Sequence, residues 1–245
     1  MFKIIRRMLI VILLCVFAVS AFYFGKTLYD YKTADKTYAS LQNRFVTHIE
    51  QDLPDATPEK KTQTPIHVDF AALKQECPDI VGWLYCPDTV INYPVVQGKN
   101  NDQYLRSGLN GKYLASGTLF VDCHNGQIGS DENYLIYGHN MKNGTMFAPL
   151  TKYKDQTYYD THPTLYFLTE EGNYQILLFA GAVVNEDSGI YSTAPDASVI
   201  EQILASSTFR SPVSLDDSDT IITLSTCSYE YNNARYIVLG KLVKL

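Results

Sequence analysis

From residue 66 onward the chain is a succession of short strand-like runs, and this spacing constrains its fold more than any other feature. The runs are rich in β-branched and aromatic residues and are separated by Gly, Pro, Asn and Asp, which favour turns. There are eight of them, at residues 80–85, 91–96, 117–121, 133–138, 164–169, 174–184, 220–226 and 235–243. Because few long helical patterns interrupt them, they predict a mostly β domain, built as an antiparallel barrel or sandwich.

Three short helices are expected among these strands. Asp69 is a suitable N-terminal cap for a helix that ends at Glu76, before a proline. A second helix is predicted around residues 146–152. A third follows Pro195, where apolar side chains recur at helical spacing at Ala197, Ile200, Leu204 and Phe209.

The N-terminus carries an uncharged, largely apolar run at residues 8–25, just long enough to cross a bilayer as a helix. Lys3, Arg6 and Arg7 precede it and would stay on the cytoplasmic side, which predicts a single-pass protein of the cell membrane with an extracellular remainder. A cleavable signal peptide is the alternative, because residues 18–20 resemble a cleavage site. The apolar run continues beyond that site, so we expect an uncleaved anchor.

Residues 26–52 show one helical stripe of apolar side chains, at Leu28, Tyr31, Ala34, Tyr38, Leu41, Phe45 and Ile49. The next segment, 53–65, is polar and interrupted by proline, which is typical of a linker. We therefore expect three parts: a cytoplasmic tip and anchor (1–25), a helical stalk with linker (26–65) and an extracellular domain (66–245).

Charge and cysteine content exclude several classes of function. The formal net charge of −6 argues against a nucleic-acid partner, which would need a basic surface. The five cysteines are odd in number and form no C-x-x-C pair, and no His or Cys cluster has zinc-ligand spacing. We expect no metal and no cofactor, and packing roles for Cys77, Cys86 and Cys123.

Cys227 closes a short strand, residues 219–228, whose two faces differ. Ile222, Leu224 and Thr226 share the face suited to a core, whereas Thr223, Ser225 and Cys227 share a small, polar face. Free cysteines usually pack among apolar side chains, so a thiol on the polar face is unusual. On the residues alone, a reactive thiol and an inert one remain open alternatives.

Two residues are candidates to activate such a thiol. Arg235 opens the last strand, and a hairpin between the last two strands would bring it beside Cys227. His139 follows an apolar strand after Gly138, which permits close backbone approach. Of the remaining histidines His124 is an outside candidate, and the nearby acid Glu230 receives no role.

These residues fall in blocks that resemble a known family. The segment 223–227, Thr-Leu-Ser-Thr-Cys, matches the TLxTC pattern of sortases, the membrane-anchored cysteine transpeptidases of Gram-positive bacteria. Arginine eight positions later and the earlier histidine complete that family's Cys–His–Arg set. Further blocks resemble its class B branch in the class B order, at residues 93–105, 117–122, 137–141, 145–147 and 236–241.

The resemblance implies the eight-stranded sortase β-barrel, with an N-terminal helix packed on it and a helix in the long connection before the nucleophile strand. It implies Cys227 as nucleophile, His139 as acid/base and Arg235 as the oxyanion- or substrate-positioning cation. Substrate-groove positions correspond to Asn101, Ile190, Tyr191 and Ser225, of which Ile190 and Tyr191 lie in a loosely aligned loop.

The implied reaction is cleavage of a C-terminal sorting signal after Thr through a thioester, then transfer of the secreted protein to an amine of the cell-wall peptidoglycan. A thiol peptidase that releases its product to water, a pilin-polymerising sortase and a silent wall-binding module are the alternatives. No residue identifies the sorting pentapeptide or the accepting amine.

Overall fold

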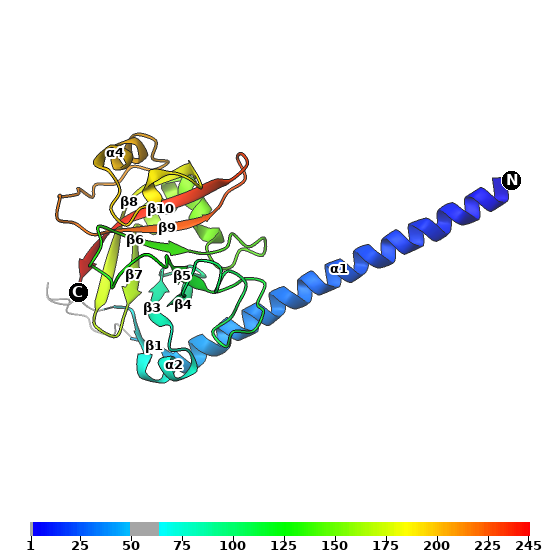
Figure 1. Cartoon of the computed structure of the whole chain (residues 1–245), viewed down its shortest axis with the longest axis horizontal. Helices are drawn as coiled ribbons and strands as arrows, with labels where there is room; N and C mark the ends of the chain where they lie inside the picture. Colours follow the sequence, from blue (N-terminus) through cyan, green and yellow to red (C-terminus); the bar gives the residue numbers. More distant parts are fainter. Residues whose placement is uncertain (1, 50–63) are drawn as a thin grey trace.

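The computed structural model describes residues 2–49 and 64–245, and its central feature is a closed eight-stranded β-barrel (Figure 1). Around the barrel the strands follow the order β10-β8-β7-β3-β4-β5-β6-β9. Their bounds are β3 (Ile80–Tyr85), β4 (Asn92–Gln97), β5 (Leu119–Val121), β6 (Asn133–Tyr137), β7 (Thr164–Leu168), β8 (Asn173–Asn185), β9 (Ile221–Cys227) and β10 (Ala234–Lys244). All eight predicted strands are confirmed, each within two residues of its expected bounds.

The expectation of a purely antiparallel sheet is wrong. Strands β4 and β5 pair in parallel, and so do β6 and β9. Parallel neighbours need a long crossover instead of a tight turn, and both pairs are joined by long connections. The number of strands alone could not predict which of them would pair in parallel. The parallel β6–β9 pair matters most, because it brings the C-terminal ends of both strands to one edge of the barrel.

The predicted helices are present, with one shift and one addition. Asp69 caps α2 (Phe70–Glu76) by accepting a hydrogen bond from the backbone N–H of Ala72 at 3.0 Å. The helix after Pro195 is α4 (Ala197–Ala205), in the connection between β8 and β9.

The helix expected around residues 146–152 is the 3-10 helix η2 (Ala148–Lys154), and it is followed by α3 (Gln156–Thr161). The sequence did not predict α3, since its Thr and Tyr residues favour strands. Asp155 nevertheless starts this helix, because its side chain accepts from the N–H of Thr157 at 2.9 Å.

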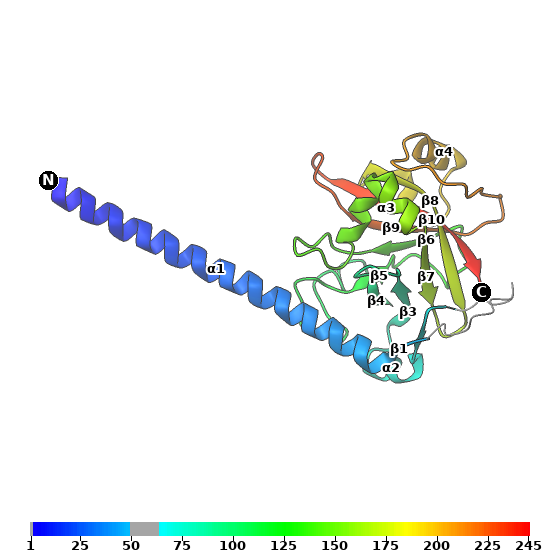
Figure 2. The same ribbon diagram turned by 180° about the vertical axis from the view of Figure 1, so that it is seen from behind.

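A single helix, α1 (Phe2–Phe45), contains both the predicted anchor and the predicted stalk (Figures 1 and 2). It is long and apolar enough to cross a membrane, and none of its most apolar stretch is buried in the protein. Its last turns pack on the barrel through Ala34, Tyr38, Leu41 and Phe45, four members of the predicted stripe. Tyr38 also donates a hydrogen bond to the Gly117 carbonyl.

The stripe was expected to continue to Ile49, but the helix ends at Phe45. There the chain enters β1 (Val46–His48), which pairs antiparallel with β2 (Ile66–Val68) in a small sheet that the sequence did not predict. Most of the predicted linker, residues 53–63, lies outside the described residues. The division of the chain at residues 25 and 65 stays a prediction.

Gly138, just beyond β6, has very close neighbours, as expected. The expectation was a close approach of backbone, but the neighbours are side chains. A Cβ atom there would lie 2.4 Å from Leu119 Cδ2 and 2.6 Å from Phe147 Cδ2. Both neighbours are fully buried and have no room to move aside.

We predict that Gly138→Ala lowers the free energy of unfolding by roughly 1–3 kcal/mol through overpacking. Thermal unfolding of the full-length chain in detergent measures this loss. Gly108→Ala is the matched control, since a Cβ at Gly108 would meet its nearest atom at an ordinary 3.5 Å. Equal melting temperatures for the two variants would contradict the prediction.

Candidate active site

Cys227 ends β9 and lies between two neighbouring strands that carry the other candidate residues. On one side, Arg235 of β10 is its direct partner in the antiparallel register. On the other side, Tyr137 of β6 is level with Ser225 in the parallel register. His139 and Cys227 each follow two residues later, so His139 reaches the edge of the barrel where Cys227 is paired with Arg235, and all three line one groove.

Polar contacts between the ends of β6 and β9 hold this edge together. The Gly138 N–H donates to the Ser225 carbonyl at 3.1 Å, and Thr226 Oγ1 donates to the Gly138 carbonyl at 2.8 Å. Beyond the strand, Asn140 Nδ2 donates to the Cys227 carbonyl at 2.9 Å. The backbone at the cysteine is therefore fixed relative to the segment that carries His139.

The His139 ring is half-buried, and its Nε2 lies 2.7 Å from the Leu105 carbonyl oxygen. A carbonyl only accepts, so Nε2 carries a proton and, in the neutral ring, Nδ1 holds the free lone pair. Burial lowers the pKa of His139 below its ordinary value; the Leu105 hydrogen bond opposes this shift, and the charge of Arg106 reinforces it. Among the described residues, no hydrogen bond joins His139 to the Cys227 sulfur.

Arg235 is held by an acid that the sequence did not single out. Its Nη2 donates to Glu186 Oε2 at 2.7 Å, and its Nη1 donates to the Ala234 carbonyl at 3.1 Å. Arg235 lies opposite Val184 on β8, and Glu186 follows that strand directly. A correct pairing of β8 with β10 would have located this ion pair, but sequence spacing alone does not.

The three residues face a groove of about 480 Å³ that six of the seven predicted site residues line. These six are Cys227, His139, Arg235, Asn101, Tyr191 and Ser225. The exception is Ile190, which is fully buried in the apolar cluster beneath the connection from β8 to β9. Ile190 therefore supports the groove loop from below.

Aromatic and hydroxyl groups form one wall of this groove. The Tyr137 and Tyr191 rings stack with centroids 6.1 Å apart, and the Tyr191 hydroxyl lies 2.9 Å from Ser225 Oγ. Burial raises the pKa of Tyr191 to about 12, so the phenol stays protonated.

The loop that carries Tyr191 is held by one fully buried amide, Asn133. Its Nδ2 donates to the carbonyls of Ile190 at 2.8 Å and Ser192 at 3.0 Å, while its Oδ1 accepts from Thr223 Oγ1 at 2.8 Å. Every polar atom of this side chain is thus used to hold the loop against β6 and β9.

Glu230, to which the sequence assigned no role, and the cysteines expected to pack lie outside the groove wall described above. Glu230 accepts hydrogen bonds from Lys154 and Ser228, which lower its pKa to about 2, and it does not line the groove. It therefore fastens the β9–β10 connection to η2. Cys77 and Cys86 are buried, as a packing role requires, whereas Cys123, for which packing was also expected, is only half-buried.

The donor atoms of Asp122, Cys123 and His124 lie within 4.8 Å of one another, close enough in principle to share a metal ion. The geometry has a simpler cause, since His124 Nδ1 lies 2.8 Å from Asp122 Oδ1 and can donate to it. Asp122, His124 and Tyr137 all line the groove, although the sequence assigned Asp122 and Tyr137 no role and left His124 an outside candidate.

Comparison with known proteins agrees with this fold. A sequence model described as the Sortase domain matches residues 84–243. Sortase B of Listeria monocytogenes is 39% identical over 172 residues, covering 67% of this chain and 70% of the relative. A solved sortase B from Bacillus anthracis superposes with a TM-score of 0.72 at 31% identity, covering 89% of this chain and all of the other. A Staphylococcus aureus sortase B–substrate complex gives 0.68 at 30%, with coverages of 72% and 85%.

The chain belongs to the sortase family. Its relatives and structural neighbours are sortase B proteins, so it lies in the class B branch that the sequence blocks indicated. As a member of this family it is a cell-wall sortase, that is, a cysteine transpeptidase. The individual roles of the groove residues remain predictions.

We predict that His139 titrates below 6.5 in the folded protein, because burial disfavours the imidazolium. Arg106→Gln removes a positive charge and should raise the midpoint, yet leave it under 6.5, since burial is the larger cause. Ring-proton NMR titration of the full-length chain measures both, with His139→Gln identifying the signal. A wild-type midpoint at or above 6.5 would contradict the prediction.

Proposed function

We propose that this protein cleaves a C-terminal sorting signal of secreted proteins after its Thr and joins the new end to an amine of the peptidoglycan. The observation that supports this most is the strand register, in which Arg235 is paired with Cys227 and His139 follows two residues after β6, the other neighbour of β9. The solved sortase B complex with substrate supports the assignment of the groove to a peptide.

In the first step the Cys227 thiol gives its proton to the neutral His139 ring, and the resulting thiolate attacks the carbonyl carbon of the Thr and forms a C–S bond. The tetrahedral intermediate collapses when the C–N bond breaks, and His139 gives a proton to the departing amine. The product is a thioester between the secreted protein and Cys227.

In the second step a peptidoglycan amine attacks the thioester carbonyl. His139, now neutral, accepts a proton from this amine as the new C–N bond forms, and the C–S bond then breaks to release the thiolate. The low pKa of His139 suits this step, because the ring is neutral near pH 7 and free to accept a proton.

Arg235 stabilises the negative charge of the tetrahedral intermediate or holds a substrate carbonyl. Its guanidinium is always charged and can donate two parallel hydrogen bonds. Glu186 fixes its direction through the 2.7 Å ion pair, so that the arginine does not sample the solvent freely. Asn101, Ser225 and Tyr191 contact the peptide along the groove, and Ile190 holds the loop of Tyr191 in place.

Residues 8–25 anchor the chain in the cell membrane with the N-terminus in the cytoplasm. Three basic residues precede the apolar stretch of α1, and the barrel lies at the other end of that helix (Figure 2). With this orientation the groove would face the outside of the cell, where secreted substrates and wall precursors are both present.

The test uses residues 26–245, because the last turns of α1 pack on the domain, and removal of the first 65 residues would expose the surface that they cover. Fluorogenic sorting peptides are incubated with and without triglycine or diaminopimelate. We expect cleavage without amine and a ligated product with amine. Cleavage with no ligated product in any amine would instead identify a thiol peptidase.

Substitutions at the site give the matching prediction. Cys227→Ala should reduce turnover by about 10³-fold or more through loss of the nucleophile, and Arg235→Lys by about 10²-fold, because a lysine keeps the charge without the planar pair of donors. Cys15→Ser in the full-length chain is the control thiol and should retain full turnover, since Cys15 lies in α1 away from the groove. Turnover that survives in Cys227→Ala would refute the assignment.

A further inference from the structure

One carboxylate in the lining of the groove, that of Asp122, binds residues from separate segments of the chain. Asp122 follows β5 and is buried, with 6% of its surface exposed. Its Oδ2 accepts from Asn101 Nδ2 at 2.8 Å and from the Tyr137 hydroxyl at 2.9 Å. Its Oδ1 accepts from the backbone N–H of His124 at 2.9 Å and lies 2.8 Å from His124 Nδ1.

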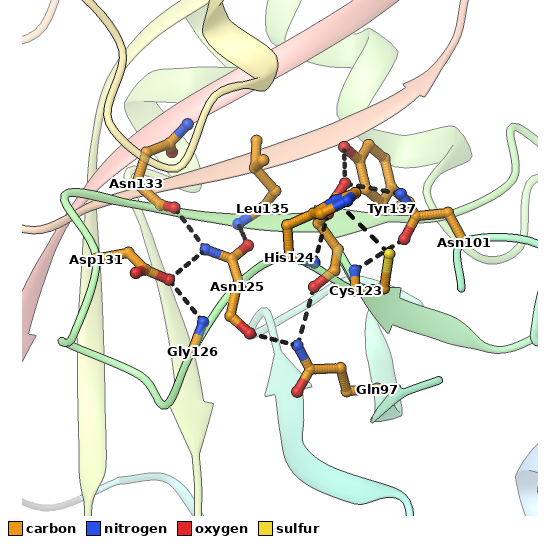
Figure 3. Close-up of polar contacts among 11 residues, drawn as sticks. Gln97, Asn101, Cys123, His124, Asn125, Gly126, Asp131, Asn133, Leu135 and Tyr137 are labelled. Atoms are coloured by element: carbon orange, nitrogen blue, oxygen red, sulfur yellow. Dashed lines mark hydrogen bonds and ion pairs between the residues drawn. The ribbon is translucent and has the colours of Figure 1, made fainter. Parts of the chain in front are cut away.

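Two of these donors are side chains of the groove wall. Asn101 comes from the connection between β4 and β5, and its Oδ1 also accepts from the Cys123 N–H at 2.9 Å, so both ends of the amide are fixed. Tyr137 comes from β6, and its ring stacks on Tyr191, which is bonded in turn to Ser225. Figure 3 shows Asn101, Tyr137, Cys123 and His124 gathered at one end of this polar network.

We propose that Asp122 is a positioning residue, whose carboxylate sets the orientation of the Asn101 amide and the Tyr137 ring for peptide binding. It acts through these two residues and not on the reacting atoms. The proposal deepens the sortase function proposed above and rests on it for its substrate.

Only an ionised carboxylate can accept from all of these donors at once. Hydrogen bonds to a charged acceptor are shorter and stronger than neutral ones. Burial raises the pKa of Asp122, but the hydrogen bonds from His124, Tyr137 and Asn101 outweigh burial and lower the net value. An asparagine at this position would present an N–H₂ group to one of the two pairs of donors, and its uncharged oxygen would hold the other pair more weakly than a carboxylate does.

A second carboxylate in the same connection provides a matched control. Asp131 Oδ2 accepts from Asn125 Nδ2 at 2.8 Å and from the Gly126 N–H at 2.7 Å. Asn125 in turn holds the backbone of β6 through the Asn133 carbonyl and the Leu135 N–H. Figure 3 shows this Asn125 group at the other end of the network, joined to the Asp122 backbone through Gln97, and Asp131 does not line the groove.

The experiment compares Asp122→Asn with Asp131→Asn in the full-length chain in detergent. We expect Asp122→Asn to lower kcat/KM for a cleaved sorting peptide about ten- to a hundredfold, mainly through a raised KM. Alkylation of Cys227 by iodoacetamide, followed by mass spectrometry of its peptide, should change less than about twofold, because Asp122 makes no contact with Cys227. Asp131→Asn should lower the melting temperature and leave KM unchanged.

Tyr137→Phe is a milder variant that removes one donor and retains the ring, and it keeps the proposal testable if Asp122→Asn does not fold. It should raise KM by a smaller factor, and the double variant should cost less than the product of the two single effects, because both remove the same hydrogen bond. If the double variant instead raises KM by the full product of the two single effects, the proposal is overturned. Equal changes in KM for Asp122→Asn and Asp131→Asn would also overturn it.

A readout without peptide separates this proposal from the proposed function. Hydrogen exchange of the Asn101 side-chain amide should be slow in the wild type and in Asp131→Asn, and at least tenfold faster in Asp122→Asn. If no peptide is cleaved by the wild type, the proposed function fails, and the exchange rates still decide whether Asp122 orients Asn101. Unchanged exchange in Asp122→Asn would refute the positioning role.

Discussion

The parallel pairing of β6 with β9 is the interaction on which the rest of this structure depends. Parallel strands end at the same edge, so the residues that follow Tyr137 and Ser225 arrive together. An antiparallel pairing would have placed His139 and Cys227 at opposite ends of the barrel. The β9–β10 hairpin then adds Arg235 at the same edge, since it is the direct partner of Cys227. The strand register thus brings His139, which is distant in sequence, to the edge of the barrel where the β9–β10 hairpin carries Cys227 and Arg235.

The local sequence predicted the strands well because β-branched and aromatic runs bounded by turn residues carry their own signal. It did not predict strand direction. A strand alternates with a period of two in parallel and antiparallel sheets alike, and so the pattern on β6 contains no information about its partner. Helix α3 was missed for a related reason: its residues favour strands individually, and the cap at Asp155 decides the outcome. The end of α1 at Phe45 depends on the pairing of β1 with β2, a contact made across the linker.

The functional site, like the fold, could be predicted from the sequence only in part. Cys227, His139 and Arg235 stand in motifs and could be named from the chain, and the structure brings all three to one groove. Asp122 and Glu186 could not, because an acidic residue at a strand end is ordinarily a solvated charge. Their importance arises from contacts made across the fold, from Glu186 to Arg235 and from Asp122 to Asn101 and Tyr137. Ile190 illustrates the opposite error: a loop position was matched by family pattern, while its side chain points into the core.

One face of β9 carries small polar residues, which is unusual for a strand of a barrel core, and the hydrogen bonds of these residues explain why. Thr223 and Ser225 are buried, and each is bonded to a group that shapes the groove: Thr223 to Asn133, which holds the Tyr191 loop, and Ser225 to Tyr191 itself. Buried polar groups are costly unless they are satisfied, and in residues 2–49 and 64–245 every buried side-chain nitrogen and oxygen has a partner. Larger apolar residues on this face would have filled the core at the expense of these bonds. The polar side chains of β9 therefore orient the groove more than they stabilise the core. Through their hydrogen bonds to Asn133 and Tyr191 they fix the Tyr191 loop relative to the strand that carries Cys227.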